Sequence, residues 1–253
     1  MYRPQELKWI LEGKTVLMKS QVICFIPCCA SKNPSGRIED HGLGLSEADL
    51  LSKWSQLIAC RRGASWCLNS SSPLTSAINL YTGSPYDIIN KSIIIQNIRA
   101  GRLRLIIISA GYGIVDAFEP IHEYEAVMKG RTATYWRECG LVDIISEYLL
   151  SSDIMKPLKV FGFFAGDVNW STTGSKYRYF FTEGLRTAKK KGLRPQLSGC
   201  FYRQSGQGVK AILGALGRTF MNFVNYNFND QFAIDIQQKA RRDGNIIISF
   251  DKI

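Results

Sequence analysis

The sequence predicts an α/β fold with a mostly parallel central sheet flanked by helices, and three observations predict it. Short apolar runs rich in β-branched and aromatic residues alternate with longer segments of helical periodicity. The first run is apolar on both faces, as a central parallel strand is. Three of the runs end in small and polar residues, which is the usual layout of a ligand site on such a sheet. We expect residues 1–253 to form a single α/β domain, with 174–244 as its basic and largely helical portion.

The elements follow from periodicity and from the residues that interrupt it. Strands are predicted at 21–27, 102–108, 159–164, 197–202 and 245–250. Helices are predicted at 5–12, 47–61, 74–80, 85–99, 133–150, 176–191, 206–224 and 230–242. Ser46 is the candidate N-cap of the second helix, and Pro85 is well placed to open the fourth.

Three predicted strands lead into loops with polar and charged side chains that could bind a ligand. These loops are Cys28–Asn33, Ser109–Asp116 and Ala165–Asn169. The first combines small residues and hydroxyls with one lysine and one asparagine, which suits an anion or a sugar, although the spacing of a Walker loop is missing. If the strands are parallel neighbours, the three loops share one edge of the sheet. Their acids and hydroxyls are then expected to meet in one pocket.

Composition narrows the class of protein. Apolar residues make up 45% of the chain, too many for a disordered protein, and no apolar run reaches the roughly 18 residues of a membrane span. The N-terminus lacks the features of a secretion signal, so a cytoplasmic location is expected. The seven cysteines show no repeated CxxC pair. Zinc ligation by Cys28, Cys29, Cys60 and Cys67 with His41 is the alternative, but we expect no metal and no cofactor.

Positive charge is concentrated in the second part of the chain. The net charge is +11, and residues 156–253 hold 16 lysines and arginines against six acids. Aromatic residues are interleaved with these lysines and arginines. This composition suits binding of both phosphates and unstacked nucleobases. A solvated helix face is the plainer explanation for any one helix. The size of the imbalance predicts DNA as the partner, with phosphate contacts from Lys176, Arg178, Arg186, Lys189, Lys190, Lys191 and Arg203.

Three spaced blocks resemble one known group of proteins. They are Pro27-Cys-Cys-Ala-Ser-Lys-Asn-Pro, Leu80-Tyr-Thr-Gly-Ser-Pro-Tyr, and Ile106-Ile-Ile-Ser-Ala-Gly-Tyr-Gly-Ile-Val-Asp followed by Ile121-His-Glu-Tyr-Glu. Together they resemble the YaaA-like superfamily, which includes the peroxide-stress protein YaaA and is similar to the uracil-glycosylase-like domain of archaeosine synthases. The resemblance covers about residues 22–128. It departs from the family where Ala117-Phe118-Glu119 separates the Val-Asp pair from Pro120, and residues 174–253 match nothing in it.

The resemblance implies a DNA glycosylase that flips a modified base, such as glucosylated hydroxymethylcytosine, out of double-stranded phage DNA. It would excise this base in antiviral defence or base excision. N-glycosidic cleavage develops oxocarbenium character, so a carboxylate is required near the sugar. Asp167 and Asp116 are the catalytic candidates because each follows a predicted strand, and Glu123 is added by the family's Ile-x-x-Tyr segment. The candidates for holding base and sugar are Ser31, Lys32, Asn33, Ser109, Gly111, Tyr112 and Asn169.

Each candidate has a plainer role as a turn, cap or core residue. Two other functions also stay open: a non-catalytic DNA-binding stress protein, and an enzyme acting on the N-glycosidic bond of free nucleosides or nucleotides. The last would not need the ten bases within 174–218. Between the carboxylates, we favour Asp167 because the basic segment follows it directly.

Overall fold

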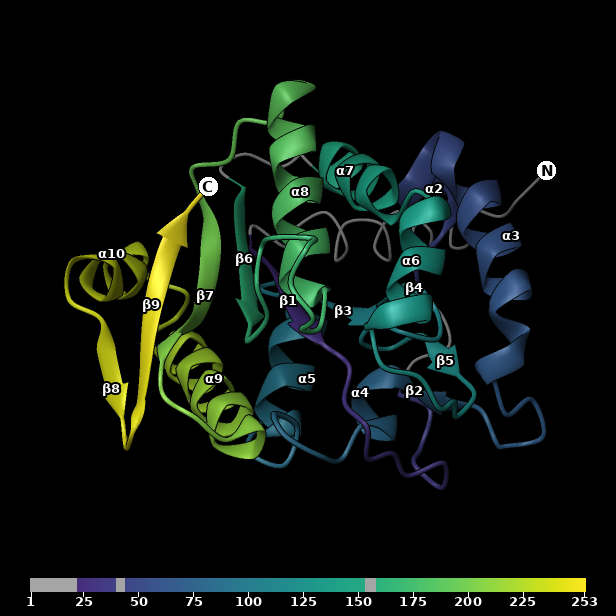
Figure 1. The fold of residues 1–253 in the computed structure, drawn as a ribbon, viewed down its shortest axis with the longest axis horizontal. Coiled ribbons are helices and arrows are strands. Elements are labelled where there is room, and N and C mark those ends of the chain that lie inside the picture. The colour runs from purple at the N-terminus through teal and green to yellow at the C-terminus, as the bar shows by residue number, and fades with distance from the viewer. Residues whose placement is uncertain (1–21, 40–43, 153–157) are drawn as a thin grey trace, which may run out of the picture.

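A computed structural model describes residues 22–39, 44–152 and 158–253. The described chain forms a mixed α/β structure in which helices flank a seven-stranded sheet (Figure 1). The helix predicted at 5–12 and the candidate ligand His41 lie outside the described residues. No helix of the described part is long and apolar enough to cross a membrane.

The sheet has the strand order β4-β3-β1-β6-β7-β9-β8. Its strands are β1 (Val22–Pro27), β3 (Arg104–Ser109), β4 (Gly113–Asp116), β6 (Lys159–Phe164), β7 (Leu197–Ser205), β8 (Arg241–Asp243) and β9 (Ile246–Lys252). The four central strands β3, β1, β6 and β7 are parallel, whereas β4, β9 and β8 each run antiparallel to a neighbour. A small second sheet pairs β2 (Thr75–Ser76) with β5 (Pro120–Ile121). The predicted mostly parallel sheet is therefore confirmed.

The helices are α2 (Glu47–Leu50), α3 (Trp54–Gly63), α4 (Ala77–Leu80), α5 (Lys91–Arg99), α6 (Gly130–Glu138), α7 (Leu141–Ser152), α8 (Tyr177–Lys190), α9 (Val209–Asn225) and α10 (Asp230–Gln238), with 3₁₀ turns η1 (Leu51–Lys53) and η2 (Ala64–Cys67). The helix predicted at 133–150 is two helices, because Gly140 adopts a positive φ of 72° between them. The fourth helix begins at Lys91, where the Asn90 side chain accepts a hydrogen bond from the Ile93 N–H, and not at Pro85.

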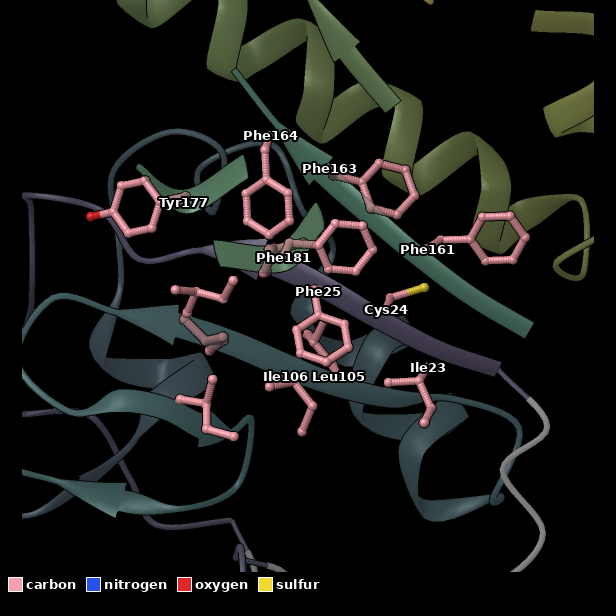
Figure 2. Packing of buried hydrophobic residues seen from close by; sticks show 14 of the residues in the cluster. Ile23, Cys24, Phe25, Leu105, Ile106, Phe161, Phe163, Phe164, Tyr177 and Phe181 are labelled. Atoms are coloured by element: carbon pink, nitrogen blue, oxygen red, sulfur yellow. The ribbon is translucent and has the colours of Figure 1, made fainter. Parts of the chain in front are cut away.

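Aromatic side chains fix the helices to both faces of the sheet. On one face, Phe25 contacts Tyr148 of α7 and Phe181 of α8, with ring centres 6.0 and 5.3 Å apart. On the other face, Phe161 lies 4.6 Å from Phe223 of α9. Figure 2 shows Phe25, Phe161 and Phe181 among the buried side chains around β1 and β6. All six residues of β1 are buried, as expected of a strand between two helical layers.

Candidate functional site

A cavity of about 1120 Å³ opens at the carboxyl ends of the parallel strands. The chain builds β3 on one side of β1 and then crosses to build β6 on the other, so the strand order reverses at β1. Ligands of open α/β sheets bind beyond the strand ends at such a reversal. The cavity is lined by residues 27–31, 82–84, 87, 126, 127, 129, 164–167, 172–175, 177, 203, 209, 210, 212 and 213.

Side chains from the loop after β1 and from the first turn of α8 line part of the cavity. The Cys28 thiol lies 3.0 Å from the Tyr177 hydroxyl, which also accepts a hydrogen bond from the Met128 N–H. In Figure 2 this hydroxyl points away from the phenyl rings of the core. The Cys29 thiol donates to the carbonyl oxygen of Ser31 at 3.0 Å, and burial raises its pKa to about 11. Cys29 is therefore a protonated thiol at neutral pH, unsuited to nucleophilic attack.

Asp167 is the one predicted carboxylate that lines the cavity. It lies in the loop after β6 and is exposed. Its Oδ1 accepts a hydrogen bond from the Asn169 N–H at 3.0 Å, a short turn that holds the carboxylate in place. The Asn169 side chain does not line the cavity; its oxygen accepts from the N–H and hydroxyl of Ser171 and shapes the same loop.

Four further charged side chains line the cavity. Arg203 is exposed at the end of β7 and donates to the carbonyl oxygen of Gly206 at 3.1 Å. Lys210 is exposed in the first turn of α9, Lys129 is exposed just before α6, and Asp87 accepts hydrogen bonds from the Ser84 hydroxyl. Of these four, only Arg203 was predicted from the sequence. The glycines that precede Lys210, Gly206 and Gly208, follow a strand and open a helix, which is the signal that could have identified it.

Asp116 lies at the opposite end of the sheet. After Ser109 the chain turns back as the antiparallel strand β4, which places Asp116 beside Ile106. Its carboxylate is 4% exposed, accepts from the Phe118 N–H, and pairs with Arg104 at 3.3 Å. Burial raises the pKa of Asp116 to about 6, although the Arg104 charge and the Phe118 N–H oppose this rise. The same guanidinium also pairs with Asp49 at 2.7 Å. The expectation that Asp116 joins the shared edge is therefore wrong.

The residues predicted to hold the base and sugar fall into two groups. Ser31 lines the cavity. The others do not: Asn33 caps a turn through Ser35, and the Lys32 ammonium donates to the Ala30 carbonyl and lies 4.3 Å from the centre of the Tyr124 ring.

The segment 109–112, predicted as a pocket wall, belongs to the core around Tyr124. Ser109 donates to the Tyr124 hydroxyl at 2.9 Å and accepts from the Tyr112 N–H, and a Cβ at Gly111 would lie 2.7 Å from the Tyr124 ring. Tyr112 is 8% exposed. Glu123 is fixed by its backbone, which donates to the Ser72 hydroxyl, and it does not line the cavity.

Most of the bases predicted to contact DNA are used within the protein. Lys176 is 5% exposed, and its ammonium donates to Asn169 and to both oxygens of Thr172. Arg178 is 8% exposed and lies 3.7 Å from the centre of the Tyr202 ring. These two side chains are therefore buried in contacts within the protein and are not available to phosphates.

The remaining bases of α8 lie toward its far end. Lys189 donates to the Ile253 carbonyl, Lys191 pairs with Asp143 and Arg186 with Glu183, while Lys190 is exposed. The helix starts at the cavity and leads back to the amino end of β7, where Leu197 pairs with Lys159. Its last turns are consequently remote from the cavity.

The described residues contain no group of three or more His, Cys, Asp or Glu side chains placed to hold a metal ion. All seven cysteines are free thiols. Comparison with known proteins adds no assignment: no family model and no curated protein matches this chain.

Proposed function

We propose that this protein is a DNA glycosylase that excises a modified base from DNA, with the extruded nucleotide held in the cavity at the strand ends. The observation that carries the proposal is a single cavity lined by an exposed carboxylate, Asp167, and by three basic side chains, those of Lys129, Arg203 and Lys210. A volume of about 1120 Å³ exceeds what small-molecule sites commonly need, so a whole nucleotide with a substituent on its base can enter.

Asp167 is the residue to which we assign the chemistry. As the N-glycosidic bond breaks, positive charge develops on the sugar, and a carboxylate stabilises that charge or removes a proton from the attacking water. Asp167 is held by its turn with Asn169, so its position costs little reorganisation. The neutral Tyr177 hydroxyl and Cys28 thiol can donate hydrogen bonds to the base.

The basic side chains at the cavity support a nucleic-acid substrate. Arg203, Lys129 and Lys210 are exposed, and a phosphate beside the extruded nucleotide can pair with them. The seven free cysteines fit action in the reducing cytoplasm.

A second candidate function is supported by the positions of the other bases. Lys176, Arg178, Lys189 and Lys191 contact the protein itself, which removes much of the charge that pointed to a polymer. An enzyme that cleaves the N-glycosidic bond of free nucleotides needs only the cavity and its three basic side chains.

The test is to incubate the purified protein with unmodified DNA, with phage-modified DNA and with free nucleotides. Mass spectrometry detects released base, and alkali reveals abasic sites. Asp167→Asn should lower the rate of release by roughly 10²- to 10⁴-fold. Asp87→Asn, which changes the other cavity carboxylate, is the matched control and should lose far less.

Release from DNA alone supports the glycosylase, and release only from free nucleotides supports the second candidate. DNA binding without any release would indicate a non-catalytic binding protein instead. Unchanged release by Asp167→Asn would remove that residue from the mechanism.

A further inference from the structure

The exposed side of α6 carries arginines that are paired with tryptophans. We call Trp66, Lys129, Arg131, Arg137 and Trp170 the α6 face. Thr132, Ala133 and Trp136 are buried, whereas Arg131 and Arg137 are exposed and lie about 120° apart around the helix axis. Two tryptophans from other segments lie under these arginines.

The cation–aromatic contacts of the α6 face are specific. The Arg137 guanidinium lies 4.3 Å from the centre of the Trp170 ring, and the Arg131 guanidinium lies 5.6 Å from that of Trp66. Trp66 is 48% exposed, which is unusual for so large an apolar side chain. Neither arginine forms an ion pair with an acid of the described residues, and Glu138 is the acid nearest to them along α6.

The α6 face adjoins the cavity through two chain segments. Lys129, immediately before α6, lines the cavity. Trp170 belongs to the loop between β6 and α8, whose residues Asp167 and Thr172 also line it. Figure 1 shows α6 and this loop on the same side of the molecule, facing the viewer.

We propose that the α6 face binds an unpaired stretch of the nucleic-acid strand that leads into the cavity. The exposed Trp66 ring and the arginine planes offer stacking surfaces that any unpaired nucleobase can use, and the guanidinium charges match the phosphates between those nucleobases. Trp170 is partly buried and supports the Arg137 guanidinium from the protein side. The proposal rests on the proposed function for the identity of the strand. It assigns the polymer contacts to α6 and to η2, and not to α8.

Charge is tested first, with a fluorescein-labelled single strand of about 16 nucleotides, a length within the range of known single-strand sites. The dissociation constant is measured by fluorescence anisotropy over a series of salt concentrations. Each phosphate contact on a single strand contributes about 0.7 to the slope of log K against log salt, so Arg131→Gln with Arg137→Gln should reduce that slope by about 1.4. The matched control is Arg186→Gln with Lys190→Gln on α8, which should leave the slope unchanged.

Stacking is tested with Trp66→Ala, which should weaken binding of the single strand by about 5- to 100-fold. Trp66→Phe, which keeps an aromatic ring, should restore most of the affinity. Circular dichroism and thermal unfolding of each variant confirm that the fold is retained. A duplex of the same sequence should bind more weakly than the single strand and should be insensitive to Trp66→Ala.

The proposal is overturned if the α6 and α8 variants change the salt slope equally, if Trp66→Ala binds as tightly as the native protein, or if the duplex binds as tightly as the single strand. These outcomes are independent of the proposed function. If the protein binds a single strand through the α6 face but releases no base, this inference is supported and the proposed glycosylase activity is contradicted. If the protein releases base from DNA at a rate that the α6 variants do not change, the glycosylase activity is supported and this inference is contradicted.

Discussion

The two ends of the central sheet differ in what their charged side chains contact. At the amino end, Arg104 bridges Asp49 and Asp116, and all three side chains are less than one-fifth exposed. At the carboxyl end, Asp167, Arg203 and Lys210 are exposed around a cavity. The first group is paired within the protein, and the second is available to a ligand.

The comparison shows that position along a strand decides the role of an acid. Asp116 and Asp167 both follow apolar runs in the sequence. Asp116 ends an antiparallel strand, so it returns to the amino end of the sheet, where an arginine pairs with it. Asp167 follows the parallel strand β6 and stays at the edge where α/β sheets bind ligands. The following variants test this difference, ranked by their expected loss of unfolding free energy.

Arg104→Met should give the largest loss, about 3 to 5 kcal/mol, because it leaves the buried Asp116 and the partly buried Asp49 without their cation. Urea denaturation measures this loss. Arg218→Met is the control, since Arg218 makes a similar two-bonded pair with Asp243 but is 44% exposed, and it should cost at most about 1 kcal/mol. Equal losses would mean that the amino-end network does not stabilise the fold.

Asp116 should make stability depend on pH in an unusual direction. Burial raises its pKa from 3.8 to about 6, so between these values the folded protein binds more protons than the unfolded chain. The contribution of Asp116 is therefore present at low pH and is lost as pH rises through 6. Relative to Asp116→Asn, the native protein should lose up to roughly 3 kcal/mol between about pH 4 and pH 7, measured by urea denaturation. A difference between the two proteins that stays constant over this range would contradict the raised pKa.

Lys176→Met should cost about 1 to 3 kcal/mol, because three oxygens of the loop 169–172 lose a charged donor. The same loop carries Asp167, so the rate of base release should fall as well. Lys190→Met, at the exposed far end of the same helix, should change stability by less than about 0.5 kcal/mol. Native-like release by Lys176→Met would show that the loop does not need its lysine.

The parallel strands and the site edge could be predicted because their signals are local. The apolar runs of β1, β3, β6 and β7 are short, continuous and bounded by polar residues. A strand of this kind must lie between two layers, and its carboxyl end must open onto a loop. The segment 165–169, with Asp167, was located in this way.

The antiparallel strands β4 and β8 were missed because they depend on pairing across a turn. β4 has only four residues and follows the turn at 110–112, so its short apolar run does not distinguish it from a loop in the sequence. β8 overlaps the end of the helix predicted at 230–242, although Gly244-Asn245, the two residues between the paired Asp243 and Ile246, is a hairpin signal. With β4 misread, Asp116 could not be placed.

The roles of the bases could not be predicted from their number. The sequence shows how many lysines and arginines α8 has, but burial of Lys176 and Arg178 depends on the loop after β6 and on β7 and β9 packing against that helix. Conversely, Lys129 and Lys210 are far apart in the sequence. They become part of one site only when the segment before α6 lies beside the loops that follow β1, β6 and β7.

The smallest change in stability is expected for Arg203→Gln combined with Lys210→Gln. Both side chains are exposed, and within the described chain the Arg203 side chain donates only to the nearby Gly206 carbonyl. The unfolding free energy should therefore change by less than about 0.5 kcal/mol. Removing two positive charges from a chain of net charge +11 also relieves some repulsion. The KM for base release should nevertheless rise, since a phosphate at the cavity loses two cations, and steady-state kinetics beside urea denaturation measures both quantities. If this variant instead lost as much stability as Lys176→Met, the carboxyl end of the sheet would resemble the amino end, and its charges would serve the fold and not a ligand.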